Sequence, residues 1–299
     1  MTLLHINPTV KTALANGEPV VALESTVITH GLPYPQNLET AQNMEAAVRD
    51  GGATPATIAL LAGQIHIGLS PDQLQALAQK PSHSVRKCSR RDIPLAIANQ
   101  EDGGTTVAGT MILAHQAGIE VFATGGIGGV HRGHPFDVSA DLIELGRTPV
   151  TVVSSGCKSI LDMPLTYELL ETHGVPVIGY QTDYIPAFFS RSSGLTADIR
   201  LDTPQQVAAT IHARRQLGLA SGTLVTVPVP EADALPQAEA EAAISQAITE
   251  ADSAGIHGGA ATPWLLARIV ELTNGRSLKA NQAFLLNNAR VAAQIAAAL

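Results

Sequence analysis

The sequence predicts an α/β fold built on a largely buried sheet, and two observations lead to this prediction. Short apolar runs of strand length alternate with longer segments of helical spacing along the chain. Hydrophobic residues make up 45% of the chain and aromatic residues only 3%. Such a composition of small apolar side chains is typical of helices packed on a buried sheet. Because the 299 residues contain no repeat, linker or clear boundary, we expect a single α/β domain over residues 1–299.

Charge and composition argue against several classes of protein. The formal net charge of −8 and the few aromatic side chains disfavour nucleic-acid binding. The two cysteines, Cys88 and Cys157, form no disulfide framework or zinc pattern. The N-terminus lacks the features of a signal peptide, and no apolar run approaches the roughly 18 residues of a membrane span. We therefore expect a cytoplasmic protein with no membrane or nucleic-acid partner.

Strands and helices alternate in the first part of the chain. The apolar run Pro19–Leu23 predicts a buried strand, and the spacing of Leu38, Ala41 and Met44 predicts a helix. Ser70 before a proline is typical of a helix N-cap. The elements predicted here are helix Val10–Asn16, strand Pro19–Leu23, helix Pro35–Arg49, strand Thr57–Ala62 with its hairpin partner Gln64–Gly68, helix Pro71–Gln79, strand Ile93–Ala98 and helix Val107–Ala117.

The second part continues the same alternation and ends in helices. Short runs rich in valine predict strands, and longer runs rich in alanine predict helices. The predicted elements are strand Val121–Ala123, helix Ser139–Leu145, strand Pro149–Val153, helix Leu165–His173, strand Val175–Tyr180, loop Ala187–Arg191, helix Thr203–Leu217, strand Gly222–Val227, and helices Ala238–Ala254, Thr262–Leu272 and Leu278–Ala298.

The stretch from Val121 to Lys158 carries the strongest functional signal. Its first strand ends in a loop with four glycines in five positions, which lets backbone amides approach a ligand closely. Its second strand ends in a turn of small residues followed by Lys158. In α/β proteins, groups at the carboxyl ends of strands form the ligand site. We therefore expect the site at these two strand ends.

Lys158 is the sharpest candidate for catalysis. Lysine is almost never fully buried, and desolvation after an apolar strand favours a neutral amine that can attack a carbonyl or anomeric carbon. The alternative is a lysine whose ammonium reaches solvent from a loop. The neighbouring Cys157 is a weaker nucleophile candidate, because the sequence places no histidine to activate it.

Glu24 ends the strand Pro19–Leu23, which is an unusual place for a carboxylate. It is either an exposed or capping residue or a general acid or base, and the residues alone leave both interpretations open.

Two further segments are candidates for binding an anion. Val85–Asp92 is the densest basic stretch of an acidic chain, and it is either a solvated charge cluster or a substrate-anion site. The segment Asp102–Thr106 precedes a long apolar helix, so its amides and hydroxyls, together with the helix dipole, form a plausible phosphate cradle.

Asp137 and Asp141 lie four residues apart near the start of a predicted helix. Helix capping by Asp137 or Ser139 is the common interpretation of such residues. A site for a hydrated hard cation such as Mg²⁺ or Mn²⁺ is the functional one. His131 and His134 have the wrong spacing for a zinc site, and either could instead hydrogen-bond a substrate.

Eight motifs, in one order, give the chain a resemblance to a known family. They are ALEST (Ala22–Thr26), ITHGLPYPQN (Ile28–Asn37), KCSRRD (Lys87–Asp92), GGTTVAGTM (Gly103–Met111), FATGGIGGVHRG (Phe122–Gly133), FDVSADL (Phe136–Leu142), GCKSILD (Gly156–Asp162) and GYQTDYIPAFF (Gly179–Phe189). The set resembles the pseudouridine-5'-phosphate glycosidases, a family that also includes the indigoidine synthase A-like proteins. The resemblance extends from about Val20 to Ala292.

The resemblance implies a fold, a reaction and a set of roles. It implies a three-layer α/β/α fold with a mixed, largely buried central sheet, assembled as a homotrimer. The reaction is the reversible cleavage of the C–C glycosidic bond of pseudouridine 5'-phosphate to uracil and ribose 5-phosphate. Lys158 matches the nucleophile, which forms an imine with the ring-opened sugar, and Glu24 matches the proton donor.

The same resemblance assigns a metal and a set of binding residues. Asp137 matches the holder of a divalent cation, typically Mn²⁺, with Mg²⁺ as another possibility. Substrate-binding positions are matched by Lys87, Val107 and Ser139-Ala140-Asp141. Beyond the matched positions, we assign His131 and Asn281 to substrate contacts and Thr106, Thr124, Gly125 and Gly126 to a phosphosugar cradle.

Two other functions fit the same residues. Another lysine-imine phosphosugar lyase or aldolase would need Lys158 without uracil specificity. A non-catalytic phosphosugar-binding protein would bind ribose 5-phosphate without needing both Glu24 and Lys158.

Overall fold

The computed structural model describes residues 3–256 and 261–299 of the chain. Its centre is a sheet of 11 strands. Nine of the strands follow one another in the order β1 (Leu4–Ile6), β4 (Gln64–Ile67), β3 (Thr54–Leu61), β2 (Val20–Leu23), β7 (Val121–Ala123), β10 (Thr151–Ser154), β14 (Thr223–Thr226), β12 (Val177–Tyr180) and β13 (Ile199–Leu201). The other two, β5 (Arg86–Cys88) and β6 (Gly103–Thr105), pair with each other, and β6 also pairs with β3.

Parallel pairing from β3 through β13 brings seven carboxyl ends to one edge of the sheet. Antiparallel pairing of β3 with β4 and with β6 makes the sheet mixed, as expected. The central strands are continuous apolar runs rather than alternating ones; every residue of β2 is buried. Such runs are typical of strands covered on both faces.

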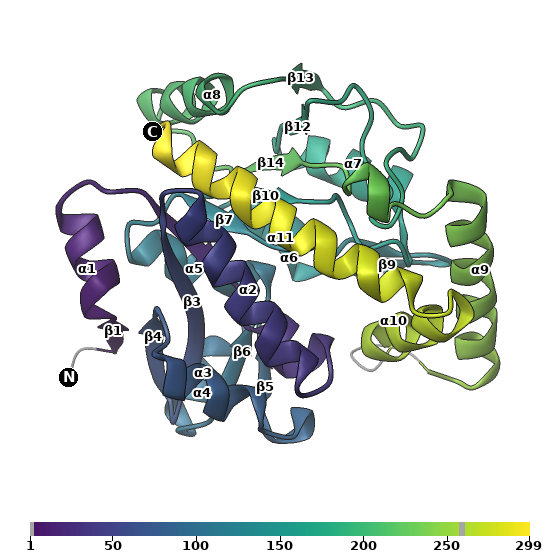
Figure 1. Cartoon of the computed structure of the whole chain (residues 1–299), viewed down its shortest axis with the longest axis horizontal. Helices are drawn as coiled ribbons and strands as arrows, with labels where there is room; N and C mark the ends of the chain where they lie inside the picture. Colours follow the sequence, from purple (N-terminus) through teal and green to yellow (C-terminus); the bar gives the residue numbers. More distant parts are fainter. Residues whose placement is uncertain (1–2, 257–260) are drawn as a thin grey trace.

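Helices cover both faces of this sheet, which confirms the α/β prediction. The helices are α1 (Pro8–Ala15), α2 (Gln36–Asp50), α3 (Pro71–Ala78), α4 (Ile93–Ala98), α5 (Val107–Gln116), α6 (Ala140–Leu145), α7 (Met163–Thr172), α8 (Pro204–Gln216), α9 (Gln237–Ser253), α10 (Ala261–Leu272) and α11 (Arg276–Ala297). Helix α11 crosses β2, β7 and β10 in front of the sheet with α2 at its side, and α5 and α6 lie behind it (Figure 1).

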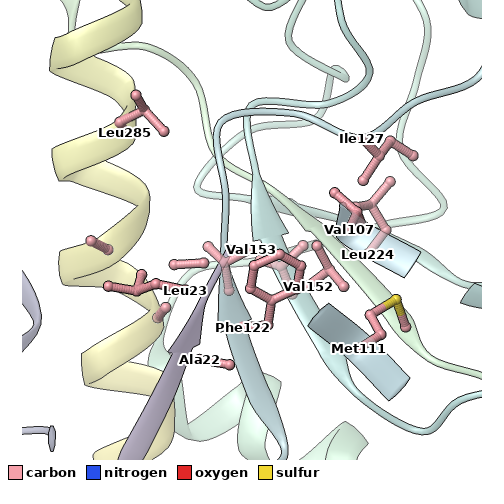
Figure 2. Packing of buried hydrophobic residues seen from close by; sticks show 14 of the residues in the cluster. Ala22, Leu23, Val107, Met111, Phe122, Ile127, Val152, Val153, Leu224 and Leu285 are labelled. Carbon is pink, nitrogen blue, oxygen red and sulfur yellow. The ribbon is translucent and has the colours of Figure 1, made fainter. Parts of the chain in front are cut away.

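The largest hydrophobic cluster fills the space between these layers. Phe122 of β7 is fully buried beside Val152 and Val153 of β10, and Met111 of α5 and Leu285 of α11 extend the cluster on either side (Figure 2). Because each of these strands is only three or four residues long, the apolar core ends directly where polar residues begin. The carboxyl edge of the sheet is thus held rigidly by the core.

A small second sheet lies at this carboxyl edge. It consists of β8 (Val130–His131), β9 (His134–Val138) and β11 (Leu161–Asp162), all antiparallel. Gly133, with a φ of +74°, makes the tight turn between β8 and β9. The polar segment between β8 and β9 is therefore the turn of a hairpin, which brings Asp137 back beside His131.

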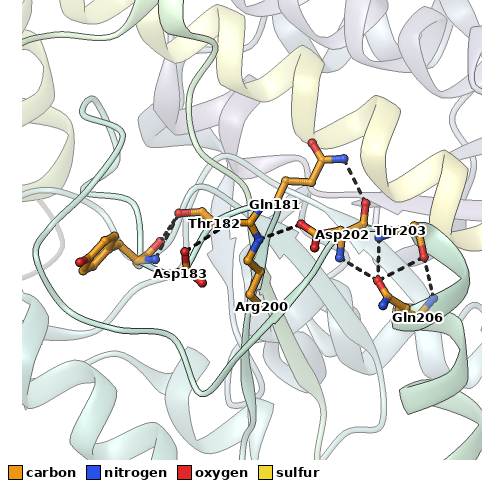
Figure 3. A network of polar contacts seen from close by, with 8 residues as sticks. Gln181, Thr182, Asp183, Arg200, Asp202, Thr203 and Gln206 are labelled. Atoms are coloured by element: carbon orange, nitrogen blue, oxygen red, sulfur yellow. Dashed lines mark hydrogen bonds and ion pairs between the residues drawn. The ribbon is translucent and has the colours of Figure 1, made fainter.

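A polar network holds β13, which is the last strand in the order that begins with β1 (Figure 3). Arg200 pairs with Asp183 and with Asp202, so it joins β13 to the loop after β12. Thr203 and Gln206 then form a capping box that starts α8, at the position predicted from the sequence.

One predicted element was wrong. Ile93–Ala98 was expected to be a strand and is helix α4. Within this run only Ile93 and Ala96 are buried, which is the three-residue spacing of a helix face rather than the alternation of a strand. The side chain of Asp92 accepts hydrogen bonds from the backbone and hydroxyl of Ser89, and this turn sets the entry into the helix.

Some elements gave no recognisable signal in the sequence. Strands β1, β5, β6 and β13 are only three residues long, and the five-residue π-helix Val27–Gly31 was not expected. Within residues 3–256 and 261–299, the structure contains no helix with the length and apolar character to cross a membrane.

Candidate active site

Four consecutive parallel strands end in a row of residues at the carboxyl edge of the sheet, and three of the four residues are polar. The residues just past β2, β7, β10 and β14 are Glu24, Thr124, Ser155 and Val227. The backbone amides of Thr124, Ser155 and Val227 donate to carbonyls of neighbouring strands or their loops, at 2.8 to 3.0 Å. The hydrogen-bond ladder between the parallel strands therefore continues past the strand ends. The row is therefore held as firmly as the sheet itself.

Glu24 is a buried carboxyl at the first position of this row, with 9% of its surface exposed. Its two oxygens accept hydrogen bonds from the hydroxyls of Thr26 and Thr124. Burial raises the pKa of Glu24, and the charge of Lys158 and the two hydroxyls offset only part of that effect. A carboxyl that keeps its proton to higher pH than usual can act as a general acid.

Lys158 enters the same site from the loop after β10. The loop pairs with the glycine loop after β7 through a bridge between Ile127 and Cys157, and the amide of Lys158 donates to the carbonyl of Ile127 at 3.0 Å. Gly156, with a φ of +84°, turns the chain immediately before this pairing. The backbone of Lys158 is thus fixed on both sides of its half-buried side chain.

The ammonium of Lys158 makes no ion pair or side-chain hydrogen bond within the described part of the chain. It nevertheless acts electrostatically on Glu24 and on Lys87. With its backbone held and no partner for its amine among the described residues, Lys158 is available to a ligand.

The structure brings all the predicted site residues to the walls of two adjoining cavities. The larger, of about 770 Å³, and the smaller, of about 80 Å³, share Glu24, Thr26, Lys87, Lys158 and Thr262. The larger one is also lined by Thr106, Val107, His131, Asp137, Ser139, Ala140 and Asp141. The smaller one is also lined by Thr124, Gly125, Gly126 and Asn281.

Lys87 faces Lys158 across this cleft. Its side chain is exposed to solvent, but partial desolvation by the surrounding protein still lowers its pKa, and the charge of Lys158 lowers it further. Burial likewise lowers the pKa of His30, and the positive charge of Lys87 lowers it further. The two lysines concentrate positive charge in a chain whose formal net charge is −8. Such a cleft favours an anionic ligand.

The rest of the basic stretch is mostly paired with carboxylates. Arg86 pairs with Glu101, and Arg90 makes two hydrogen bonds to the buried Glu144 at 2.6 and 2.7 Å. These arginines therefore fit the interpretation as a charge cluster, whereas Lys87 fits the interpretation as an anion site.

The start of α5 offers fewer free amides than the sequence suggested. Thr106 caps the helix by accepting from the amide of Gly109 at 3.2 Å, and Asp141 accepts from the amide of Ala108 at 2.9 Å. The amide of Val107, at the first helical position, has no partner within the described residues. The predicted phosphate cradle is thus reduced to this amide and the neighbouring side chains.

Asp141 also fixes the glycine loop. Its second oxygen accepts from the amide of Gly128 at 2.8 Å. A Cβ at Gly128 would lie 2.2 Å from the hydroxyl oxygen of Ser139, so only glycine allows this approach. Ser139 itself caps α6 by accepting from the amide of Asp141, which decides between the two predicted caps. A substrate contact of Asp141 would use the remaining lone pairs of its carboxylate.

Asp137 lies exposed on β9 and lines the cleft together with His131. Burial lowers the pKa of His131, and the charge of Asp137 opposes this lowering. Among the described residues, no group of three or more histidine, cysteine, aspartate or glutamate side chains is arranged to hold a metal ion. A single carboxylate fits a hydrated divalent cation that keeps most of its water ligands, and it does not fit zinc.

Cys157 is fully buried, and burial raises the pKa of its thiol to about 12. The thiol is therefore protonated and inert at neutral pH, which supports the preference for Lys158.

Several cleft residues escaped the sequence analysis. Thr26 and His30 lie inside motifs that were recognised, but no local pattern showed that they line the site. Phe188, from the loop after β12, packs on Phe284 with ring centroids 4.5 Å apart and lines the smaller cavity. Only the fold joins these distant segments.

The fold and the cleft define an α/β protein in which a buried carboxyl and a half-buried lysine line one cleft at the carboxyl ends of parallel strands. A family model described as indigoidine synthase A like protein matches residues 9–298. The chain belongs to this indigoidine synthase A-like family.

Named relatives and solved structures agree with the assignment. A pseudouridine-5'-phosphate glycosidase of Paracoccus denitrificans is 57% identical over 99% of this chain and 98% of its own length. Its namesake in Escherichia coli is 53% identical over 98% of this chain and 95% of its own. The crystal structure of the prealnumycin C-glycosynthase AlnA in complex with ribulose 5-phosphate matches with a TM-score of 0.92 and 42% identity, covering 100% of this chain and 97% of that one.

Proposed function

We propose that this protein is a pseudouridine-5'-phosphate glycosidase, which cleaves the C–C bond between uracil and ribose 5-phosphate reversibly. The observation that carries the proposal is the meeting of Glu24 and Lys158 in one cleft, at the ends of β2 and β10. The full-length identity to relatives with this name, 51% to 57%, supports the substrate.

Lys158 acts as the nucleophile in this proposal. After its ammonium gives up a proton to solvent, the amine attacks C1' of the sugar, and the bond from C1' to the ring oxygen breaks as that oxygen takes the proton of Glu24. The nitrogen, positively charged after the attack, loses a proton to the carboxylate of Glu24. Its lone pair then forms a protonated imine with C1' while the bond to C5 of uracil breaks, and the electron pair left on C5 takes up the proton from Glu24. Water hydrolyses the imine to ribose 5-phosphate and restores the amine. The fixed backbone of Lys158 holds the amine near the attacked carbon.

Glu24 supplies the protons that these steps need. It gives its proton to the ring oxygen as the sugar opens, and as a carboxylate it can exchange protons with C5 of uracil. The raised pKa of Glu24 supports the first of these roles, since the carboxyl must enter the reaction protonated. The hydroxyls of Thr26 and Thr124 hold it in place in both protonation states.

The remaining cleft residues bind the substrate in this proposal. Lys87 and the amide of Val107, which has no partner among the described residues, lie on the wall of the larger cavity, where positive charge and a hydrogen-bond donor suit the phosphosugar. Asn281 and Phe188 line the smaller cavity, which has the aromatic and amide groups that suit a planar base.

We propose that Asp137 holds a divalent cation, Mn²⁺ or Mg²⁺, largely through water. When bound, the ion supplies positive charge beside the phosphosugar oxygens. We expect chelator to lower the rate, added Mn²⁺ to restore it, and Asp137→Asn to raise the Mn²⁺ concentration needed at least about tenfold, because one charged ligand is lost. Isothermal titration with Mn²⁺ alone gives a readout independent of turnover. Asp183→Asn, at an exposed aspartate outside the cleft, is the control. Equal Mn²⁺ binding by both variants would contradict the role of Asp137.

The test of the function itself is release of uracil. We expect the purified protein, incubated with pseudouridine 5'-phosphate and Mn²⁺, to release uracil and ribose 5-phosphate in equal amounts. Under the same conditions, deoxyribose 5-phosphate and fructose bisphosphate separate this activity from that of an aldolase. A folded protein that releases no uracil, or that cleaves the other phosphosugars instead, would rule the proposal out.

Two further expectations remain predictions. The homotrimer follows from the family resemblance and can be measured by sedimentation equilibrium. The cytoplasmic location can be measured by cell fractionation.

A further inference from the structure

Asn288 of α11 lies directly behind the catalytic row, and no role was assigned to it from the sequence. Its side chain is fully buried, with 0% of its surface exposed. The amide nitrogen donates to the carbonyl of Thr124 at 2.9 Å and to the hydroxyl of Ser155 at 3.2 Å. That hydroxyl in turn donates to the carbonyl of Val227 at 2.9 Å. A single side chain thus joins the residues just past β7, β10 and β14.

Two of these contacts lead directly to the groups that perform the chemistry. Thr124 donates its own hydroxyl to Glu24. Ser155 opens the loop that carries Lys158 three residues later. Asn288 therefore connects the partner of the acid with the loop of the nucleophile, although it contacts neither. Both donors of one amide group are used, and leucine, with a similar size, offers neither.

We propose that Asn288 is a positioning residue that sets Glu24 and Lys158 relative to each other. The inference rests on the proposed function for its kinetic consequence, and on the hydrogen bonds alone for its structural one. Without Asn288, the carbonyl of Thr124 loses its donor, and the Thr124 hydroxyl and the Ser155 loop become free to move independently.

The kinetic test is Asn288→Leu, with Ser277→Ala as the matched control. Ser277 lies on the same helix, is 1% exposed and hydrogen-bonds to Thr273, away from the strand ends. We expect Asn288→Leu to lower kcat about 10- to 100-fold with little change in KM, since a misplacement of about 1 Å has that effect on reacting groups. Ser277→Ala should leave kcat unchanged.

The pH profile separates positioning from mere support of the fold. The hydrogen bond from the Thr124 hydroxyl lowers the pKa of Glu24. Weakening this bond should therefore raise that pKa and shift the fall of activity that Glu24 controls to higher pH. The charged groups that face Glu24, namely Lys158, Asp141 and Lys87, are unaltered in this variant. A variant with a lower melting temperature but the same kcat and the same pH dependence of activity as the wild type would overturn the proposal.

Hydrogen exchange provides a second measurement that does not depend on activity. The amides of Ile127 and Lys158 bridge the two loops at 3.0 Å each, and we expect both to exchange faster in Asn288→Leu than in Ser277→Ala. Equal exchange would overturn the inference. If Asn288→Leu does not fold, Asn288→Ala replaces it, with the same outcomes expected. If the wild type releases no uracil, the proposed function fails, and exchange alone decides on Asn288.

Discussion

Replacing Lys158 by alanine should abolish release of uracil while the protein stays folded. We expect kcat to fall by at least about 10³-fold, since removal of a nucleophile leaves only what binding and the remaining groups contribute. The half-buried side chain makes no ion pair or side-chain hydrogen bond within the described residues, so its loss should change the free energy of unfolding little. Steady-state kinetics and urea denaturation measure the two quantities.

Trapping of the imine tests the same residue directly. Borohydride added to the wild type with ribose 5-phosphate should leave a covalent adduct on the peptide that contains Lys158, and Lys158→Ala should show none. Lys87→Ala is the comparison within the cleft: it should raise KM but keep the adduct on Lys158. An adduct on Lys87, or full turnover by Lys158→Ala, would show that the nucleophile lies elsewhere.

Replacing Glu24 by glutamine should have the second-largest effect, a fall in kcat of about 10²- to 10⁴-fold, as expected for loss of a general acid. Glutamine keeps the shape and can still bond the two threonine hydroxyls, so the fold should persist. Activity of the wild type should fall as pH rises through the pKa of Glu24. Because burial raises that pKa, this fall should lie at higher pH than for an exposed carboxyl, and residual activity of Glu24→Gln should lack it.

Glu45→Gln is the control for this substitution. Glu45 has the same exposure, 9%, and also accepts a bond from a threonine, Thr57, at 2.7 Å, but it lies on α2 away from the cleft. We expect it to keep full activity. A Glu24→Gln variant with the activity and pH profile of Glu45→Gln would remove Glu24 from the mechanism.

The sequence predicted the layers of the fold because its signals are local. The buried runs of β2, β7 and β10 and the capping residues of α3 and α8 depend on neighbours within a few residues. The run Ile93–Ala98 was misassigned because six apolar residues with a proline fit a strand as well as a helix; burial on only one face decides for the helix. Strands of three residues, such as β5 and β6, carry too few residues for any periodicity.

The site was predictable to the extent that motifs carried it. Glu24, Asp137 and Lys158 stood out because charge follows an apolar strand or starts a helix. Other features depend on contacts between residues 33 to 164 positions apart. Examples are the hydrogen bond from the amide of Ala108 to Asp141 and the contacts of Asn288 with Thr124 and Ser155. No local pattern encodes such contacts, so only the assembled sheet and helices reveal them.

The position of α11 has a consequence for folding. The row at the strand ends comes from β2, β7, β10 and β14, which are spread over residues 20 to 226, and α11 crosses three of these strands. Contacts between such distant segments form slowly, because long loops must close first. If Asn288 positions Glu24 and Lys158 as proposed, their alignment during synthesis is complete only after residues 276–297 have left the ribosome and docked. A growing chain should thus hold much of the sheet before it holds any activity.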